Sequence, residues 1–277
     1  MIKAKENKFI KNPIFLSYTS LSDFLKCPNS YYLKNIYRDP KTGNRVQIAS
    51  PFLSLGSTVH DSIKWFLEME GQITFPQLEA KFRNLWLKYT GKRGGFSNKE
   101  EEATFGKRGL KMLDNFYKNA KKLEKAMPTI NFPKYNLFED VILMGNFDFV
   151  GEKEDGTLHV LDFKTGTGDV KDAVQLYIYA ILAEANFQKQ VTEASFWYLD
   201  RDECPKPIVL DPLEPQLEWL REKAKELKKA IEKGSWVCTK PDSCQDCLIY
   251  KAIIDGKGQF QFTDERYHKD IYFLGNK

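Results

Sequence analysis

An acidic and a basic residue stand two positions apart in the apolar segment HVLDFKT, residues 159–165. Because successive side chains on a β-strand point to opposite faces, Asp162 and Lys164 are expected to share one face. Burying either charge is unfavourable unless the two groups compensate each other or serve a ligand. The segment therefore predicts either a structural ion pair or a site that performs chemistry.

A second carboxylate favours the chemical interpretation. Asp148 in GNFDFV belongs to the strand expected before Asp162, and EKEDGT between them has the composition of a hairpin turn. Two converging carboxylates repel each other unless a cation such as Mg²⁺ or Mn²⁺ lies between them. Such an ion polarises a phosphate oxygen and activates water, which Lys164 is suited to orient or deprotonate. The chemistry indicated is phosphodiester hydrolysis.

The elements that must position these groups follow from the apolar spacing. Residues from about 135 to 163 have the apolar pattern of β-strands, and residues from about 170 to 185 have helical spacing. The segment ASFWYLD is typical of a strand, and residues from about 213 to 233 are typical of a long charged helix. A hairpin, helix and strand in this order predict a small mixed sheet flanked by helices. The expected fold class is α/β.

The first half of the chain is expected to be mostly helical. The expected helices cover about 20–37 with a break at Pro28, then 57–70, 76–90 and 99–127. No internal repeat or linker is evident, so we expect one domain over residues 1–277. Its parts would be a helical region at about 15–130, a catalytic core at about 135–235 and a Cys-rich segment at about 236–277.

Composition narrows the class of protein. With 42% hydrophobic and 29% charged residues, a 277-residue chain can build a substantial core. The net charge of +4 permits nucleic acid as a partner without requiring it. Since no apolar run suits a signal peptide or a membrane span, we expect a soluble cytoplasmic protein with no membrane partner.

The ordered motifs resemble a known family. Gly145-x-x-Asp148, Asp162-Phe163-Lys164 and Gln175-x-x-x-Tyr179 resemble the signature of the RecB-type branch of the PD-(D/E)XK nuclease superfamily. Upstream, LGSTVHDSI is similar to the histidine-bearing helix of that branch, and LSDFLKCPNSYYL to its N-terminal Cys-Pro helix. The matches run from about residue 18 to 250, and their order makes them jointly specific.

The resemblance implies roles for particular residues. The implied metal ligands are His60, Asp148, Asp162 and the backbone carbonyl of Phe163. Lys164 would be catalytic, while Gln175 and Tyr179, on one helix face, would position the substrate or the lysine. An imidazole ligand favours Mn²⁺ over Mg²⁺. Without the resemblance, His60 would be interpreted as an ordinary histidine of an amphipathic helix. Gln175 would be interpreted as a polar residue at the edge of a helix face, and Tyr179 as an aromatic residue of the core.

Four of the five cysteines have the distribution of a metal site. Related AddB-type and CRISPR-associated RecB-like nucleases carry a [4Fe-4S] cluster on one N-terminal and three C-terminal cysteines, which here would be Cys27, Cys238, Cys244 and Cys247. The usual C-terminal order, Cys-x2-Cys-x5-Cys, is inverted here, and Ile253 stands where the last cysteine would be. Three alternatives therefore stay open: a cluster completed by Cys238, a four-thiolate zinc site, or a lost site. Cys204 has no place in this scheme.

The function implied is that of a metal-dependent deoxyribonuclease. Similar proteins mostly act as exonucleases on single-stranded DNA or DNA ends, in repair and recombination or in CRISPR spacer processing. Because the sequence contains no Walker A motif, a helicase would be a separate partner, as would CRISPR adaptation proteins. The alternatives are a catalytically silent module that binds DNA or a partner, and a nuclease directed at RNA.

Overall fold

A computed structural model describes residues 1–2, 12–170, 172–238 and 240–275. The chain forms two compact units, each built from two separate chain segments. The first unit contains residues 1–22 and 119–235, and the second contains residues 23–118 and 236–277. The single domain expected over residues 1–277 stays a prediction.

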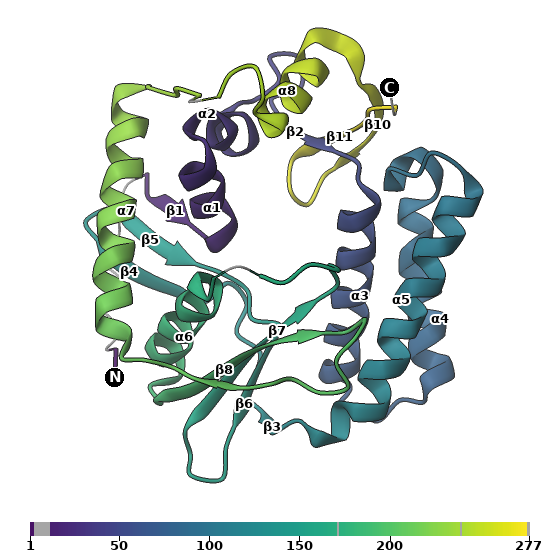
Figure 1. Cartoon of the computed structure of the whole chain (residues 1–277), viewed down its shortest axis with the longest axis vertical. Helices are drawn as coiled ribbons and strands as arrows, with labels where there is room; N and C mark the ends of the chain where they lie inside the picture. The colour runs from purple at the N-terminus through teal and green to yellow at the C-terminus, as the bar shows by residue number, and fades with distance from the viewer. Residues whose placement is uncertain (3–11, 171, 239, 276–277) are drawn as a thin grey trace. The chain divides into compact units, whose positions relative to one another are not determined.

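The first unit is organised around a five-stranded mixed sheet of order β3-β6-β7-β8-β9 (Figure 1). Its strands are β3 (Lys125–Ala126), β6 (Phe149–Glu152), β7 (Leu158–Lys164), β8 (Val191–Tyr198) and β9 (Ile208–Val209). The antiparallel pair β6–β7 is the predicted hairpin, and β7 and β8 are parallel. Helix α6 (Val174–Phe187) makes the crossover between them and packs on both strands. The mixed sheet flanked by helices is therefore confirmed.

A smaller sheet completes the first unit. It has the order β1-β5-β4, with β1 (Ile14–Leu16), β5 (Val141–Met144) and β4 (Lys134–Phe138). Helix α6 also packs on β4 and on the long helix α7 (Leu213–Lys233). Most side chains of α6 are buried, among them the apolar Leu176, Ile178, Ile181 and Leu182. This helix therefore contributes to the core of the unit, and it also positions the residues of its own first turn.

The second unit combines helices with a three-stranded sheet. The helices are α2 (Pro28–Tyr31), α3 (Pro51–Glu68), α4 (Phe75–Trp86), α5 (Lys99–Asn119) and α8 (Gln245–Ala252), with short turns η1 (Tyr32–Ile36), η2 (Leu87–Tyr89), η3 (Gly91–Gly94) and η5 (Ile253–Lys257). The sheet has the order β10-β11-β2, with β10 (Gln259–Asp264), β11 (Lys269–Phe273) and β2 (Arg45–Ile48). Helices α3, α4 and α5 run side by side (Figure 1). Helix α1 (Tyr18–Lys26) contains the boundary between the units.

The structure confirms one helical expectation, corrects another and adds one element. The break at Pro28 is confirmed, since α1 ends at Lys26 and α2 begins at Pro28. The helix expected over 99–127 is wrong in its last part, because α5 ends at Asn119, η4 (Ala120–Lys122) is a short turn, and β3 then pairs with β6. The β10–β11 hairpin was not expected from the sequence, and it pairs with β2 across more than two hundred residues.

A buried histidine joins three segments of the first unit. His159 on β7 is 1% exposed, with Nδ1 2.8 Å from Glu124 Oε1 and Nε2 2.8 Å from Ser195 Oγ. Burial alone would raise the pKa of Glu124, but the hydrogen bond with His159 holds it below its ordinary value. Because buried polar groups are costly unless they are paired, this network stabilises the packing of β7 and β8.

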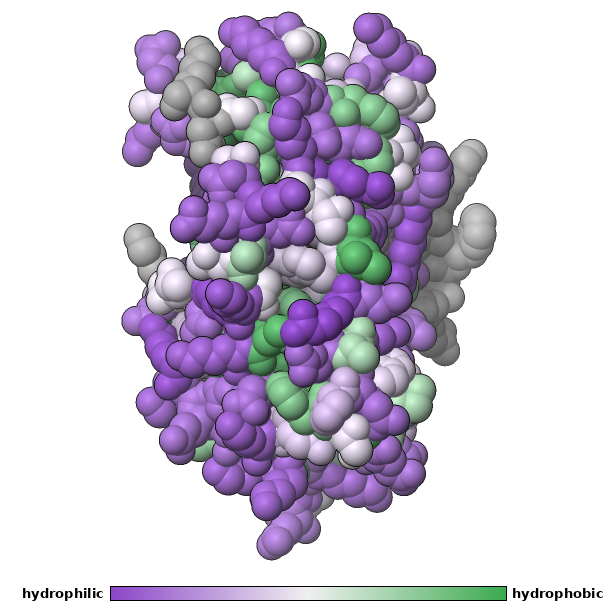
Figure 2. All heavy atoms as spheres, turned by 90° about the vertical axis from the view of Figure 1, so that its right-hand side faces the viewer, coloured by the Kyte–Doolittle hydropathy of each residue, from purple (hydrophilic) through white to green (hydrophobic). Residues whose placement is uncertain are grey.

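Within the part of the chain that is described, no helix combines the length and the apolar composition needed to cross a bilayer. The face drawn in Figure 2 is mostly hydrophilic, and its hydrophobic residues form small scattered patches.

Gly109 of α5 permits a close approach to α4, which gives the first prediction. A Cβ atom at Gly109 would lie 2.5 Å from Phe82 Cζ and 3.0 Å from Leu55 Cδ1. Phe82 is buried and cannot move freely, so Gly109→Ala is expected to lower the free energy of unfolding by about 1–3 kcal/mol. Urea unfolding followed by circular dichroism measures this change.

Gly106 is the matched control, since it lies on the same helix. A Cβ atom there would meet nothing closer than Trp86 at 3.8 Å. Gly106→Ala is therefore expected to be stabilising by about 0.5–1 kcal/mol through helix propensity alone. Equal effects of the two substitutions would contradict the close packing of α4 on α5.

Candidate active site

Asp162 and Lys164 lie on one face of β7, as their spacing predicts. The carboxylate of Asp162 is almost completely buried, with the residue 3% exposed, and Lys164 Nζ lies 2.8 Å from its Oδ2 atom. The same Nζ is 4.7 Å from the centre of the Phe196 ring on β8, where Phe196 pairs in register with Asp162. The lysine is therefore held between a carboxylate and an aromatic face.

Gln175 connects the acid and the base. It lies in the first turn of α6, where its Oε1 accepts a hydrogen bond of 2.6 Å from Lys164 Nζ. Its Nε2 donates to Asp162 Oδ1 at 2.8 Å and to the Tyr179 hydroxyl oxygen at 3.1 Å. One amide thus fixes the positions of three other polar groups, all on the face of the sheet that α6 covers.

Tyr179 lies one turn further along α6 and close to both carboxylates. Burial raises the pKa of its hydroxyl far above the ordinary value, and the charges of Asp162 and Asp148 raise it further. The phenol therefore stays protonated at neutral pH. A Cβ atom at Gly145 would lie 3.3 Å from Tyr179 Cε1 and 3.1 Å from Leu182 Cδ1, so the glycine allows this ring to approach the strand ends closely.

Asp148 is held against β7 by a backbone contact. It directly precedes β6, and its Oδ2 accepts a hydrogen bond of 2.9 Å from the Phe163 amide. Continuing the β6–β7 register by one residue places Asp148 opposite Asp162. Carboxylate oxygens and a backbone carbonyl are the donors that Mg²⁺ and Mn²⁺ prefer, so the donor set of Asp148, Asp162 and the Phe163 carbonyl fits a divalent cation.

The structure thus brings Asp148, Asp162, Phe163, Lys164, Gln175 and Tyr179 together within the first unit. His60 lies in the second unit, on α3, where it lines a polar pocket.

Two neighbours of this site were not anticipated from the sequence. Phe196 contacts Lys164 as described, and the burial of Tyr18, together with the charges of Asp172 and Asp162, raises the pKa of its hydroxyl. The parallel pairing of β7 with β8 was the signal that could have indicated Phe196. Tyr18 is distant in sequence from the other members, so no spacing rule indicates it.

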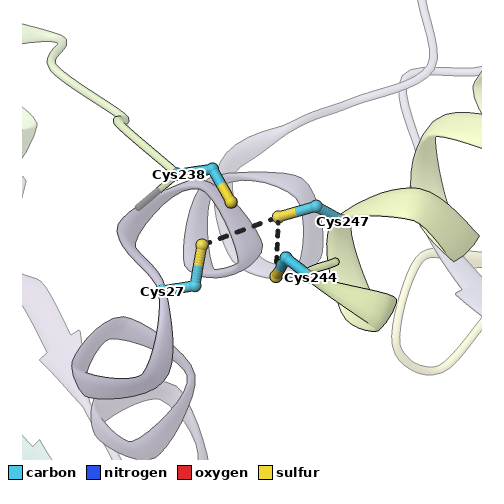
Figure 3. A group of neighbouring side chains, drawn as sticks. All are labelled: Cys27, Cys238, Cys244 and Cys247. Atoms are coloured by element: carbon cyan, nitrogen blue, oxygen red, sulfur yellow. Dashed lines mark hydrogen bonds between the residues drawn. The ribbon is translucent and has the colours of Figure 1, made fainter. Parts of the chain in front are cut away.

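Four cysteines converge in the second unit. The Sγ atoms of Cys27, Cys238, Cys244 and Cys247 all lie within 4.8 Å of one another, and their side chains point toward a common centre (Figure 3). Cys247 Sγ is 3.6 Å from Cys27 Sγ and 3.4 Å from Cys244 Sγ. Cys238 therefore lies with the other three cysteines, as both a cluster completed by Cys238 and a four-thiolate zinc site require. Ile253, at the position of the usual last cysteine, is buried beside the group, and Cys204 is exposed.

Contacts between distant segments position these thiols. Trp236 packs against the rings of Tyr31 and Tyr32, with both centroid distances at 5.6 Å. Lys34 Nζ binds Asp23 Oδ1 and Asp246 Oδ2, each at 2.9 Å. These contacts hold the segment of residues 236–247 against the N-terminal helices, where Cys27 precedes α2.

The sulfur spacing has chemical consequences. The separations are too long for disulfide bonds, which need about 2.05 Å. A tetrahedral zinc ion with Zn–S bonds of about 2.3 Å separates its thiolates by about 3.8 Å, close to the spacing seen here. A [4Fe-4S] cluster binds each thiolate to a different iron atom and so requires the sulfurs to spread. Burial would raise the pKa of Cys27, but the Ser30 amide and the neighbouring thiols lower it below its ordinary value.

Comparison with known proteins adds an independent finding. Residues 15–252 match the family model of the PD-(D/E)XK nuclease superfamily. A search of curated proteins finds no significant match. The matched range takes in segments of both units, and it includes every candidate residue from Cys27 to Cys247. Because the match covers most of the chain and the hydrogen-bonded Asp162, Lys164 and Gln175 lie inside it, the chain belongs to the PD-(D/E)XK nuclease superfamily.

Proposed function

We propose that this protein is a metal-dependent nuclease that hydrolyses phosphodiester bonds of DNA. The observation that carries the proposal is the group formed by Asp162, Lys164 and Gln175, in which a buried carboxylate, a lysine and an amide are mutually hydrogen-bonded. Members of this superfamily are generally metal-dependent nucleases, which agrees with the donor set of the site. A purely structural ion pair would not need Asp148 beside it.

Each residue has a defined task in this proposal. Asp148, Asp162 and the Phe163 carbonyl would hold the divalent ion, and the resemblance adds His60. When bound, such an ion polarises a phosphate oxygen and lowers the pKa of coordinated water. Lys164 would orient the attacking water or take up its proton, since its Nζ lies 2.8 Å from Asp162 Oδ2.

Gln175 and Tyr179 act as positioning residues. The amide of Gln175 holds Lys164 and Asp162 at once, and its contact with the Tyr179 hydroxyl fixes its own orientation. Because the phenol stays protonated, it can donate a hydrogen bond to an acceptor at all pH values of practical interest.

The substrate class rests on the resemblance to the RecB-type branch. We propose an exonuclease that acts on single-stranded DNA or DNA ends, in repair and recombination or in CRISPR spacer processing, with a helicase or CRISPR adaptation proteins as partners and a cytoplasmic location. The net charge of +4 is compatible with a nucleic-acid substrate. An RNA-directed nuclease and a silent binding module are the alternatives that the experiment below separates.

The second prediction tests the chemistry. Asp162→Asn and Lys164→Met are each expected to reduce the cleavage rate of end-labelled DNA in Mn²⁺ by about 10²–10⁴-fold, because metal binding or proton transfer is lost. Chelation of divalent ions should abolish the wild-type activity. Lys189→Met is the matched control, since Lys189 pairs with Glu152 at the opposite end of β6 and should leave the rate unchanged.

Comparison of substrates decides between the alternatives. Cleavage of single-stranded RNA in preference to DNA would replace the proposal with the RNA-directed nuclease. Wild-type protein that is inert on both nucleic acids in Mn²⁺, Mg²⁺ and other divalent ions would favour the binding module. His60→Ala, assayed over a range of Mn²⁺ concentrations, tests the remaining ligand, and an unchanged metal requirement would exclude it.

The third prediction concerns positioning. Gln175→Leu is expected to lower kcat about 10–100-fold with little change in KM, because Lys164 loses the acceptor that orients it. The exposed Gln190, which precedes β8, provides the control Gln190→Leu. A loss confined to KM would show that Gln175 contacts substrate instead.

The fourth prediction concerns the four cysteines, which we propose bind a structural metal group. The resemblance indicates a [4Fe-4S] cluster, and the sulfur spacing fits a single zinc ion. Anaerobically purified protein should contain either about four iron atoms with broad visible absorption, or one zinc ion without it. Cys247→Ser should lose the metal and lower Tm, whereas Cys204→Ser should do neither. A metal-free wild type would exclude both groups.

A further inference from the structure

The second unit contains a polar pocket that His60 lines and whose other residues have no role in the proposed hydrolysis. It has a volume of about 270 Å³ and lies among the N-terminal half of α3, the turns η2 and η3, and the β10–β11 hairpin. All of its lining residues belong to the second unit.

Positive charge predominates in the lining. The cationic residues are Lys88, Arg93, Arg266 and Lys269, and the acidic residues are Asp61 and Asp264. The charge of Lys88 is neutralised within the pocket, since its Nζ forms an ion pair with Asp264 Oδ2 at 3.0 Å. The pocket therefore retains more positive than negative charge, which favours an anionic ligand.

Lys269 is the most informative of these cations. Its half-buried ammonium donates a hydrogen bond of 2.7 Å to Gln47 Oε1, a neutral acceptor. Burial and the nearby Arg45 lower the pKa of Lys269, and Asp264 offsets only part of this effect. Because its partner is neutral, the charge of Lys269 is stabilised when an anion enters the pocket.

The neighbouring carboxylate does not serve this lysine. Asp270 is fully buried, and Thr42, Asn44 and Thr263 donate hydrogen bonds of 2.5, 3.0 and 2.7 Å to its oxygens. Lys269 and Ile271, but not Asp270, line the pocket, as the alternation of side chains on β11 requires. On β11, Asp270 is therefore buried in the core, whereas Lys269 lines the pocket.

Aromatic rings stand among the cations. Tyr89, Phe262 and Tyr267 line the pocket, and the Arg93 guanidinium lies 4.6 Å from the centre of the Phe262 ring. Tyr267 is 44% exposed, with Arg266 and Lys269 at 5.3 and 5.8 Å from its ring centre. Cations combined with exposed aromatic rings are typical of sites that bind single-stranded nucleic acid, where phosphates contact the charges and bases stack on the rings.

We propose that this pocket binds a nucleotide unit of a single-stranded nucleic acid, with its phosphate at Lys269 and Arg266 and its base against Tyr267. The inference deepens the proposed function by naming a substrate-binding site on the second unit, and it rests on that function for the identity of the polymer. A duplex keeps its bases stacked on each other and so cannot use the ring. An acidic peptide would use the cations alone, and the test below separates it.

Binding is measured on the whole 277-residue chain with Lys164→Met as background and with chelator present, so that no cleavage occurs. The probe is fluorescent oligothymidylate of about ten nucleotides, within the size range of single-strand sites, titrated at several salt concentrations. Lys269→Met and Arg266→Gln should each weaken binding about tenfold, and each should reduce the salt dependence by about 0.7 in the log–log slope, the value for one single-strand phosphate contact. A merely structural role would leave that slope unchanged.

Tyr267→Leu tests the base contact. It should weaken binding about tenfold without changing the salt slope, and it should have no effect on an abasic oligomer of equal length. Lys111→Met removes one charge from the exposed face of α5 and serves as the matched control, with binding expected to change less than twofold. Circular dichroism verifies folding, and the exposed Arg266 keeps the test valid if Lys269→Met perturbs β11.

The outcomes distinguish the inference from the function on which it rests. Pocket variants that bind like Lys111→Met, in a protein that cleaves DNA, would overturn the inference and leave the function standing. If the wild type binds the oligomer through the pocket but does not cleave DNA, the inference would stand and the proposed function would be overturned. Equal loss for the abasic and base-containing oligomers on Tyr267→Leu, or competition by poly-glutamate as effective as by oligothymidylate, would replace nucleotide recognition with general anion binding.

Discussion

The burial of a charged carboxylate on β7 is the constraint on which the candidate site depends. Six of the seven residues of this strand are buried, including Asp162. An isolated buried carboxylate would lose several kcal/mol of hydration, so its charge must be compensated locally. Lys164 and Gln175 provide that compensation, and they do so only if α6 begins directly beside the end of β7. The position of α6, and the small Gly145 that lets Tyr179 approach, follow from this requirement.

The second unit depends on a different constraint, the closure of a long chain. Cys27 and Cys247 are separated by 220 residues and lie with their sulfurs 3.6 Å apart. A cross-link that closes a loop of this length removes entropy from the unfolded chain worth about 5 kcal/mol at 25 °C, on a chain-entropy model. Trp236 and Lys34 add contacts between the same segments. A metal group here would therefore stabilise the unit without taking part in hydrolysis.

The sequence predicted the local features well, because they depend on short spacings. The hairpin, the crossover helix and the shared face of Asp162 and Lys164 each follow from a pattern within residues 148–179. The partners Gln175 and Tyr179, implied by the resemblance, lie on the helix face where the i and i+4 spacing places them. The end of α5 was placed too late, because tertiary pairing of β3 with β6 overrides the helical propensity of residues 120–127.

The features that the sequence did not predict are those made by distant segments. The pairing of β11 with β2 joins residues 269–272 to residues 45–48, and no local pattern encodes such a register. The polar pocket arises from this pairing, since Gln47 and Lys269 meet only when the two strands are side by side. The candidate catalytic residues of the first unit come from the stretch 148–179, whereas the residues that line the pocket come from strands and turns far apart in the chain. A sequence signature of this kind therefore specifies a reaction class more readily than it specifies a substrate.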